Sequence, residues 1–317
     1  MARRPSRGAG RGGVWLFLLG VIVGGGVLYL VLRDHRSAPG GDRPDSPTAA
    51  SSEAPQAPAS PAGEYAGAPD MPSLPREAPD AEPVGADGRH LPGHVALVID
   101  DLGERPEDLV PLFALGQPLT YAVLPFEKHT RDVVAELRRR RVEMLLHLPM
   151  QPLNGEDPGP GALRVDMDAA TLRKRTEAAL AAVPGAQGVN NHMGSRMSED
   201  ETALTPVLQV IGEHGLFFLD SRTSGQSVAY RTARSLGLPA AERHVFLDRD
   251  PSAEAVRAQF RRLLDLSRSR GAAVAIGHPL PETLQVLTEE VPKAAAAGFV
   301  FVPVSDLLDR SGTDSDQ

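Results

Sequence analysis

Carboxylate and imidazole side chains follow directly after several apolar segments of this chain. Four such segments end on Asp100-Asp101, His147, Asp220 and His278, and a shorter fifth segment ends on Asn190-Asn191-His192. In parallel α/β sheets the functional residues collect at the carboxyl ends of the strands. Carboxylates combined with histidines are the donor set of a metal-dependent hydrolase. The pattern therefore predicts hydrolytic metal chemistry at one edge of a parallel sheet.

Asp100 and Asp101 are adjacent, so on a regular strand their side chains point to opposite faces. A bend at the strand end presents both carboxylates to one site, where two close carboxylates resist joint ionisation. One carboxylate is then suited to act as a base while a metal holds the other. The alternative is that Asp101 only caps the turn through Leu102 and Gly103.

Three histidines occupy comparable positions at the ends of predicted strands. The alternative for His147 is a core histidine with satisfied hydrogen bonds. His192 belongs to a segment rich in donors and acceptors, residues 190–196, where the alternative is a turn whose Asn side chains bond backbone groups. His278 follows Gly277, which permits a close approach of the backbone.

Other polar residues near these positions are candidates for supporting roles. Asp220 is expected to orient a histidine or bind a ligand, and its alternative is a helix cap. The remaining histidines, among them His244, are expected at surface or turn positions. Further candidates for substrate binding or for orienting the metal ligands are Asn190, Asn191, Ser195 and Arg196.

The composition excludes several other kinds of chemistry. Cysteine is absent, which excludes thiolate metal sites, a cysteine nucleophile and disulfides. The formal net charge of -8 argues against a nucleic-acid partner. The chain has no P-loop, no dinucleotide-binding glycine motif after a strand and no G-x-S-x-G elbow, which argues against nucleotide binding and serine-hydrolase chemistry.

An uncharged apolar run covers residues 14–32, and four arginines precede it. A helix over this run is about 29 Å long, against about 30 Å of bilayer hydrocarbon. The arginines are expected to stay in the cytoplasm. We therefore expect a single-pass anchor that places the rest of the chain on the periplasmic side of the inner membrane. The alternative is a cleaved signal peptide, whose apolar region is shorter.

The composition divides the chain into five predicted segments. They are a basic cytoplasmic tail (1–13), the anchor (14–32), a disordered linker rich in Pro, Ala and Gly (33–92), a globular domain (93–310) and a disordered tail (311–317).

Within the globular domain, short apolar runs alternate with longer segments of helical periodicity. We predict strands over 95–99, 119–124, 142–147, 188–190, 216–220, 244–247, 272–277 and 299–303, and helices over 106–115, 130–141, 169–183, 199–214, 228–236, 253–270 and 282–297. Asp168, Ser252 and a capping box that begins at Ser198 mark predicted helix starts. Strands that are apolar throughout are typical of parallel sheets covered by helices. About seven or eight units favour a complete or incomplete (β/α) barrel, with an open doubly wound sheet as the alternative.

Five motifs in this order resemble the divergent polysaccharide deacetylases: residues 98–103, 147–150, 190–195, 218–221 and 277–279. The resemblance covers about residues 93–308. Better-characterised polysaccharide deacetylases, which are related more distantly, have a distorted (β/α) barrel and remove N- or O-acetyl groups from sugars. The resemblance implies Asp100 as the base, Asp101 and His147 as metal ligands, and His278 as the general acid.

The chain departs from the better-characterised enzymes at the second metal histidine. Four residues after His147 it has Gln151, and a neutral amide is a poor zinc ligand. His192 is then expected to supply the third ligand from a different strand. The Arg-Pro-Tyr motif of those enzymes is also missing, with residues 190–192 in the corresponding region.

The expected function is metal-dependent deacylation, and specifically deacetylation, of a cell-envelope polysaccharide such as peptidoglycan. Zn²⁺ held by Asp101, His147 and His192 is expected to polarise the acyl carbonyl and activate water. Asp100 takes the proton of the water and His278 protonates the leaving group. Asn190, Asn191 or backbone N–H groups are expected to stabilise the oxyanion. The alternative is a catalytically inactive barrel that binds glycan or an envelope partner.

Overall fold

The computed structural model describes residues 93–308. The predicted basic tail, anchor, linker and C-terminal tail lie outside the described residues. Within residues 93–308, no helix is both long enough and apolar enough to cross a membrane.

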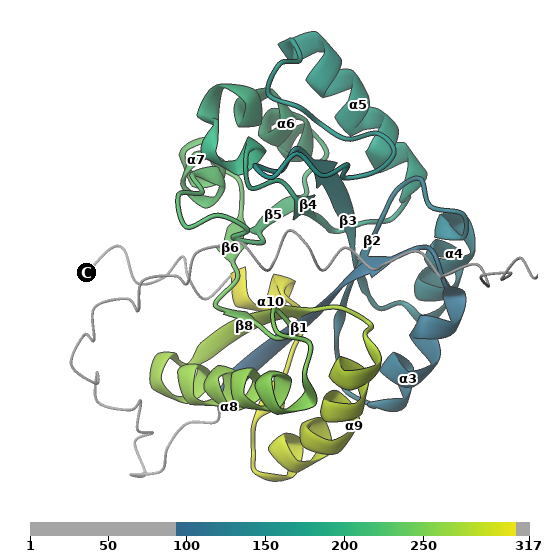
Figure 1. Cartoon of the computed structure of the whole chain (residues 1–317), viewed down its shortest axis with the longest axis vertical. Helices are drawn as coiled ribbons and strands as arrows, with labels where there is room; N and C mark the ends of the chain where they lie inside the picture. The colour runs from purple at the N-terminus through teal and green to yellow at the C-terminus, as the bar shows by residue number, and fades with distance from the viewer. Residues whose placement is uncertain (1–92, 309–317) are drawn as a thin grey trace, which may run out of the picture. The chain divides into compact units, whose positions relative to one another are not determined.

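The described chain alternates strands with helices along almost its whole length (Figure 1). The strands are β1 (His94–Leu102), β2 (Thr120–Val123), β3 (Glu143–Met150), β4 (Gly188–Met193), β5 (Phe217–Asp220), β6 (Ala240–Glu242), β7 (Val245–Phe246), β8 (Ala272–Gly277) and β9 (Val300–Phe301). The helices are α3 (Leu109–Ala114), α4 (Thr130–Arg140), α5 (Ala169–Ala182), α6 (Glu201–Glu213), α7 (Ala229–Ser235), α8 (Ala253–Arg270), α9 (Pro281–Ala296) and α10 (Ser305–Leu308), with single 3-10 turns at Pro106–Asp108 and Met197–Glu199.

The strands form one parallel sheet in the order β6-β5-β4-β3-β2-β1-β8-β7, and β9 pairs with the start of β1. From β1 to β6 each strand lies beside its predecessor in sequence, as in a barrel. In an open doubly wound sheet, the order in which successive strands are added would instead reverse at an inner strand. In the described part of the chain no ladder joins β6 to β7, so the fold is an incomplete (β/α) barrel, as the sequence predicted.

Several predicted boundaries were wrong in ways that matter for the site. The strand predicted over 188–190 continues as β4 to Met193, so His192 lies on a strand rather than in a loop. The predicted capping box at Ser198 is replaced by a 3-10 turn, and Asp200 caps α6 by accepting a hydrogen bond from the Ala203 N–H. Asp168 and Ser252 cap α5 and α8 as predicted.

Two short elements were not predicted at all. The strand β6 has three residues and the helix α10 has four, which is too short for either periodicity to be visible in the sequence.

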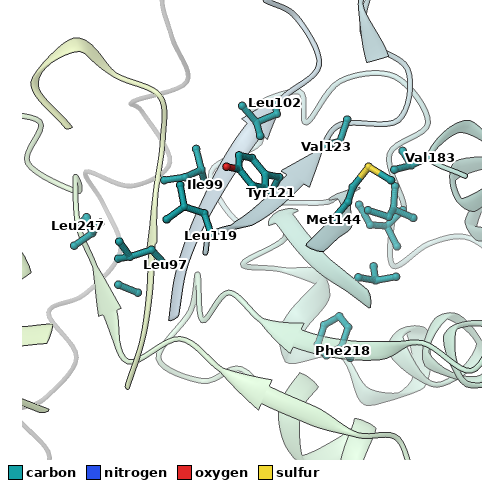
Figure 2. Packing of buried hydrophobic residues seen from close by; sticks show 14 of the residues in the cluster. Leu97, Ile99, Leu102, Leu119, Tyr121, Val123, Met144, Val183, Phe218 and Leu247 are labelled. Atoms are coloured by element: carbon teal, nitrogen blue, oxygen red, sulfur yellow. The ribbon is translucent and has the colours of Figure 1, made fainter. Parts of the chain in front are cut away.

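The hydrophobic core has two layers because side chains alternate across each strand. The larger layer lies between the sheet and the surrounding helices, and it includes Leu97, Ile99 and Tyr121 (Figure 2). The smaller layer fills the barrel interior with Ala96, Val98, Ala122, Leu145, Leu219, Val274 and Ile276, together with Val304 and Leu307 from the segment at α10. In Figure 1, α10 lies in the middle of the ring of helices.

Candidate metal centre and acid–base site

The site residues continue the interior-facing alternation of the strands beyond the apolar layer. Asp100 follows Val98 by two positions, His147 follows Leu145, Ser221 follows Leu219, and His278 follows Ile276. The register pairs His147 with Asn190 across β3 and β4, so these two side chains share one face. Because every second side chain of a strand points to the same face, these polar side chains lie directly above the interior core, at the carboxyl ends of the strands.

Asp101 reaches the same site through an irregular backbone. Its φ of 58° lies in the left-handed region, which non-glycine residues rarely adopt. The register of β1 against β2 also shifts between Ile99 and Leu102. This bulge is the bend that allows two consecutive carboxylates to face one centre.

Asp101, His147 and His192 converge, each offering one donor atom within 4.8 Å of the others. Asp101 Oδ1 lies 2.9 Å from His192 Nδ1 and 3.2 Å from His147 Nε2. The two imidazole nitrogens are 3.1 Å apart. This cluster is the only such group of three among residues 93–308, and it is the set expected from the sequence.

The cluster fits a divalent metal ion in donor type and in spacing. Two ligands on a tetrahedral zinc ion lie about 3.3 Å apart, given bond lengths of about 2.0 Å. Asp101 Oδ1 is buried and accepts no hydrogen bond of acceptable geometry, although two nitrogens lie nearby. Asp101 also keeps 17% of its side chain exposed, while His147 is fully buried, so solvent contacts the cluster on the Asp101 side.

Asn190 joins the metal cluster to the second carboxylate. Its Oδ1 lies 2.9 Å from His147 Nδ1, which assigns the N–H to Nδ1 and directs the Nε2 lone pair at the cluster. Its Nδ2 donates to Asp100 Oδ1 at 2.9 Å and to Ser221 Oγ at 3.3 Å. Asp100 Oδ2 remains directed at the cluster, 3.6 Å from His147 Nε2.

His278 is held by Asp248, a carboxylate that the sequence analysis missed. Asp248 Oδ1 lies 2.9 Å from His278 Nδ1, and Asp248 Oδ2 accepts bonds from the His278 N–H at 2.6 Å and from Thr283 Oγ1 at 2.8 Å. This arrangement directs His278 Nε2 at the site, 3.7 Å from Asp101 Oδ2. Asp248 follows directly after the predicted strand 244–247, so the strand-end signal used for the other residues would have found it.

The pKa values of Asp100 and Asp101 are shifted in opposite directions by burial and by the neighbouring charges. Burial raises the pKa of Asp100, although His147 and His278 oppose it. Burial also acts to raise the pKa of Asp101, but the charges of His192 and His278, together with the close approach of His147, lower it well below its usual range. Asp100 is therefore the stronger base of the pair, and Asp101 is the better permanent anion.

The carboxylates in turn raise the pKa values of His147 and His278. Burial lowers the pKa of His147, but Asp100 and Asp101 outweigh this effect and raise it. Burial also opposes protonation of His278, yet Asp248 and Asp101 raise its pKa to about 10. Without metal, His278 therefore carries a proton at neutral pH.

Three of the other four expected residues, Asn191, Asp220 and Ser195, use their side chains to bond backbone groups. Asn191 Oδ1 accepts from the Ser221 N–H, and its Nδ2 donates to the Met193 carbonyl. Asp220 accepts from the Arg222 and Tyr230 N–H groups and from Ser227 Oγ. Ser195 Oγ accepts from the Leu153 N–H, and Arg196 is exposed. Asn191 and Asp220 have the opposite strand parity to Asn190 and Ser221, which turns them away from the interior face.

Gln151 also makes a structural bond. Its Oε1 accepts the Val165 N–H at 3.0 Å, which fixes the long loop after β3. The amide oxygen is thus used by the backbone, and the metal cluster does not include it.

An incomplete (β/α) barrel with an Asp-His-His cluster at its strand ends defines a deacetylase-like protein. Residues 97–308 match the family model described as divergent polysaccharide deacetylase. The chain belongs to the divergent polysaccharide deacetylase family.

Two curated relatives and one solved structure share this domain. The chain is 36% identical over 225 residues to the uncharacterized protein YibQ of Escherichia coli (strain K12), covering 71% of this chain and 70% of YibQ. It is 37% identical over 193 residues to an uncharacterized protein of Haemophilus influenzae (strain ATCC 51907 / DSM 11121 / KW20 / Rd), covering 61% of this chain and 69% of that protein. The crystal structure of the uncharacterized protein ATU2773 from Agrobacterium tumefaciens C58 has a TM-score of 0.64 and 26% identity, and the match covers 72% of this chain and 99% of that chain.

Proposed function

We propose that this protein is a metal-dependent deacylase that removes acetyl groups from a cell-envelope polysaccharide such as peptidoglycan. The observation that carries the proposal is the convergence of Asp101, His147 and His192 beside a second buried carboxylate and a carboxylate-held histidine. Family membership supports the polysaccharide substrate class. The predicted anchor and linker before residue 93 support an envelope location.

Asp101, His147 and His192 are the residues that would hold the ion, with Zn²⁺ as the proposed metal. A bound divalent ion supplies Lewis-acid polarisation of an acyl carbonyl and makes water acidic enough to act as a nucleophile near neutral pH. The protein then has to supply a base for the proton of that water and an acid for the leaving group.

Asp100 is the proposed base. Its Oδ1 is held by Asn190, whereas its Oδ2 is directed at the cluster and is available for a proton. The oxygen of water attacks the acyl carbon while its proton passes to Asp100 Oδ2. The raised pKa of Asp100 makes this transfer more favourable than it would be for an ordinary aspartate.

His278 is the proposed acid. Asp248 holds its Nδ1 and keeps Nε2 directed at the reaction centre. As the bond between the acyl carbon and the leaving nitrogen breaks, His278 Nε2 transfers a proton to that nitrogen. The products are acetate and a free amine, or an alcohol when the substrate is an O-acetyl ester.

The second candidate is a catalytically inactive barrel that binds glycan or an envelope partner. Gln151 favours it, because this residue replaces the second metal histidine of better-characterised deacetylases and bonds Val165 instead. The shared network of Asp100, Asn190 and His147 opposes it, because a scaffold has no physical need for a buried carboxylate beside a metal cluster.

Asp100→Asn separates the two candidates. Asparagine keeps the volume and can accept from Asn190 but cannot take a proton, so acetate release should fall by roughly 10²–10⁴-fold with metal content unchanged. Acetate release from acetylated peptidoglycan and chitooligosaccharides is the measurement, with zinc content determined on the same samples. The matched control is Asp132→Asn, an exposed aspartate on α4 that should leave the rate unchanged. Equal metal-dependent rates in wild type and Asp100→Asn would overturn the assignment, and no acetate release by the metal-loaded wild type would favour the binding barrel.

A further inference from the structure

The loop after β2 lies between two of the three strands that carry the metal cluster and the base. In the sheet, β2 is flanked by β1, which carries Asp100 and Asp101, and by β3, which carries His147. The strand β2 itself ends on the apolar Val123 and contributes no reactive side chain of its own. The loop that follows it, residues 124–129, is therefore positioned beside the reaction centre without a role in the proposed chemistry.

This loop is fastened to the turn that carries Asp101. The Leu124 N–H donates to the Leu102 carbonyl at 2.7 Å, and the His129 N–H donates to the Gly103 carbonyl at 2.9 Å. The Thr130 hydroxyl closes the loop by donating to the Leu124 carbonyl at 2.7 Å. The backbone of the loop is consequently held against the turn that carries Asp101.

Phe126 presents an aromatic ring on this loop with 40% of its surface exposed. It is the only aromatic residue among the exposed large hydrophobic residues in the described chain. The ring is packed from one side by the loop after β3, because a Cβ on Gly161 would lie only 2.3 Å from Phe126 Cε2. Leu153, on the same β3 loop, is 58% exposed. A supported ring that stays exposed is suited to stacking against a ligand.

Glu127 follows Phe126 and places a half-buried carboxylate near the metal cluster. Burial raises the pKa of Glu127, as do the charges of Glu104 and Asp101, whereas His192 lowers it. Glu127 also lies against the turn that carries Asp101, because a Cβ on Gly103 would be only 3.3 Å from Glu127 Cβ. An ionised carboxylate is an acceptor only, so it pairs with hydroxyl or amide donors and repels anionic ligands.

We propose that Phe126 and Glu127 form a sugar-binding subsite beside the metal centre. The apolar face of an N-acetylhexosamine ring stacks on Phe126, and a hydroxyl of the sugar donates to the Glu127 carboxylate. This inference rests on the proposed function, since it describes how an uncharged glycan is held for deacetylation. It goes further by assigning glycan recognition to the β2 loop.

The test measures binding of chitotetraose by calorimetry to metal-loaded protein that carries Asp100→Asn, which prevents turnover. Phe126→Ala should weaken binding by about tenfold, which corresponds to the loss of one ring contact of about 1.4 kcal/mol. Phe126→Tyr should restore most of the affinity, because tyrosine keeps the ring face. Glu127→Gln should weaken binding by severalfold. Val110→Ala on α3, which truncates another exposed apolar side chain, is the matched control.

A kinetic measurement distinguishes failure of the subsite from failure of the proposed function. In the Asp100-containing protein, Phe126→Ala should lower kcat/KM for chitotetraose about tenfold more than kcat/KM for 4-nitrophenyl acetate, which has no sugar ring. Binding that depends on Phe126 without any deacetylation would uphold the subsite and overturn the enzymatic function. Deacetylation with equal chitotetraose affinity in wild type, Phe126→Ala and Glu127→Gln would overturn the subsite alone. Chitotetraose that does not bind the wild-type protein would also overturn the subsite.

Discussion

At the scale of single residues, Asn190 determines how the reactive groups relate to one another. Both polar groups of its side-chain amide are hydrogen-bonded: the oxygen to His147, and the nitrogen to Asp100 and Ser221. The sequence analysis considered Asn190 as an oxyanion donor, but a fully bonded amide has no donor left for that purpose. We instead assign it to positioning, because it fixes the orientation of a proposed metal ligand and of the proposed base together.

Substitutions in and around the metal cluster should weaken zinc affinity by different amounts. His192→Ala removes one of three donors and should weaken zinc affinity by more than about 100-fold. Asn190→Ala leaves His147 unoriented and should cost about 10–100-fold, the usual effect of an outer partner of a metal ligand. Gln151→Ala should have little effect, because its Oε1 bonds the Val165 N–H.

Competition calorimetry with a chelator of known zinc affinity measures this series. Val110→Ala is the control for substitution far from the site. If Gln151→Ala costs more affinity than His192→Ala, the third ligand has been assigned incorrectly. Proton release on metal binding should accompany the measurement, since the metal displaces protons from the histidines.

At the scale of secondary-structure elements, Arg243 and His244 carry the chain from β6 to β7, which no ladder joins within the described residues. The Arg243 guanidinium donates to the carbonyls of Ser221 and Arg222 at 2.6 Å and 2.7 Å. His244 exchanges bonds with Val274 on β8: its N–H donates to the Val274 carbonyl, and its Nδ1 accepts the Val274 N–H at 3.0 Å. His244 was expected at a surface or turn position, whereas it is partly buried and extends the sheet.

The accepting role of His244 predicts a pH-dependent loss of stability. Burial, followed by the charges of Arg270 and Arg243, lowers its pKa to about 4 from 6.5. As pH falls below 6.5 the unfolded chain takes up a proton first, so the folded state loses stability down to about pH 4 and no further below it. The loss attributable to His244 should reach about 3 kcal/mol.

Urea unfolding of residues 93–317 between pH 8 and 4 measures this effect. His244→Asn places an oxygen near the position of Nδ1 but does not titrate, so its free energy of unfolding should decline less over the same range. His129→Asn, at a partly exposed histidine paired with Asp132, is the control. Parallel stability curves for wild type and His244→Asn would show that His244 does not control acid stability.

At the scale of the whole molecule, the site and the chain entry lie at opposite edges of the sheet. The metal cluster lies at the carboxyl ends of the strands, whereas β1 begins at His94, directly after the first described residue. The predicted linker and anchor would therefore be attached to the domain at the edge opposite the site.

The proposed membrane topology can be tested directly. The arginines before residue 14 should keep the amino terminus in the cytoplasm, so the carboxyl terminus should be exported. Alkaline phosphatase fused after Gln317 should be active, and green fluorescent protein at the same position should stay dark. Replacing residues 14–32 with a polar segment of equal length is the control and should reverse both results. Fluorescence from the unaltered fusion would contradict the proposed topology.

The sequence by itself determined the order of the elements and which polar residues lie at the ends of the strands. Continuous apolar runs specify buried parallel strands, and a polar residue at the end of such a run has to lie at the sheet edge. These local patterns predicted the incomplete barrel, and they named Asp101, His147 and His192 as the residues that the structure now brings together. Periodicity and strand ends are visible in sequence because each depends only on neighbouring residues.

Only the tertiary structure decided which polar residues share a face and which partners hold them. Strand parity turns Asn190 inward and Asn191 outward, and a one-residue error in a strand boundary would exchange the two. The left-handed backbone of Asp101 cannot be inferred from its residue type, because it depends on how β1 pairs with β2. The bond between Asp248 and His278 joins residues 30 positions apart, and such pairs form only when separate strands are aligned in the folded sheet.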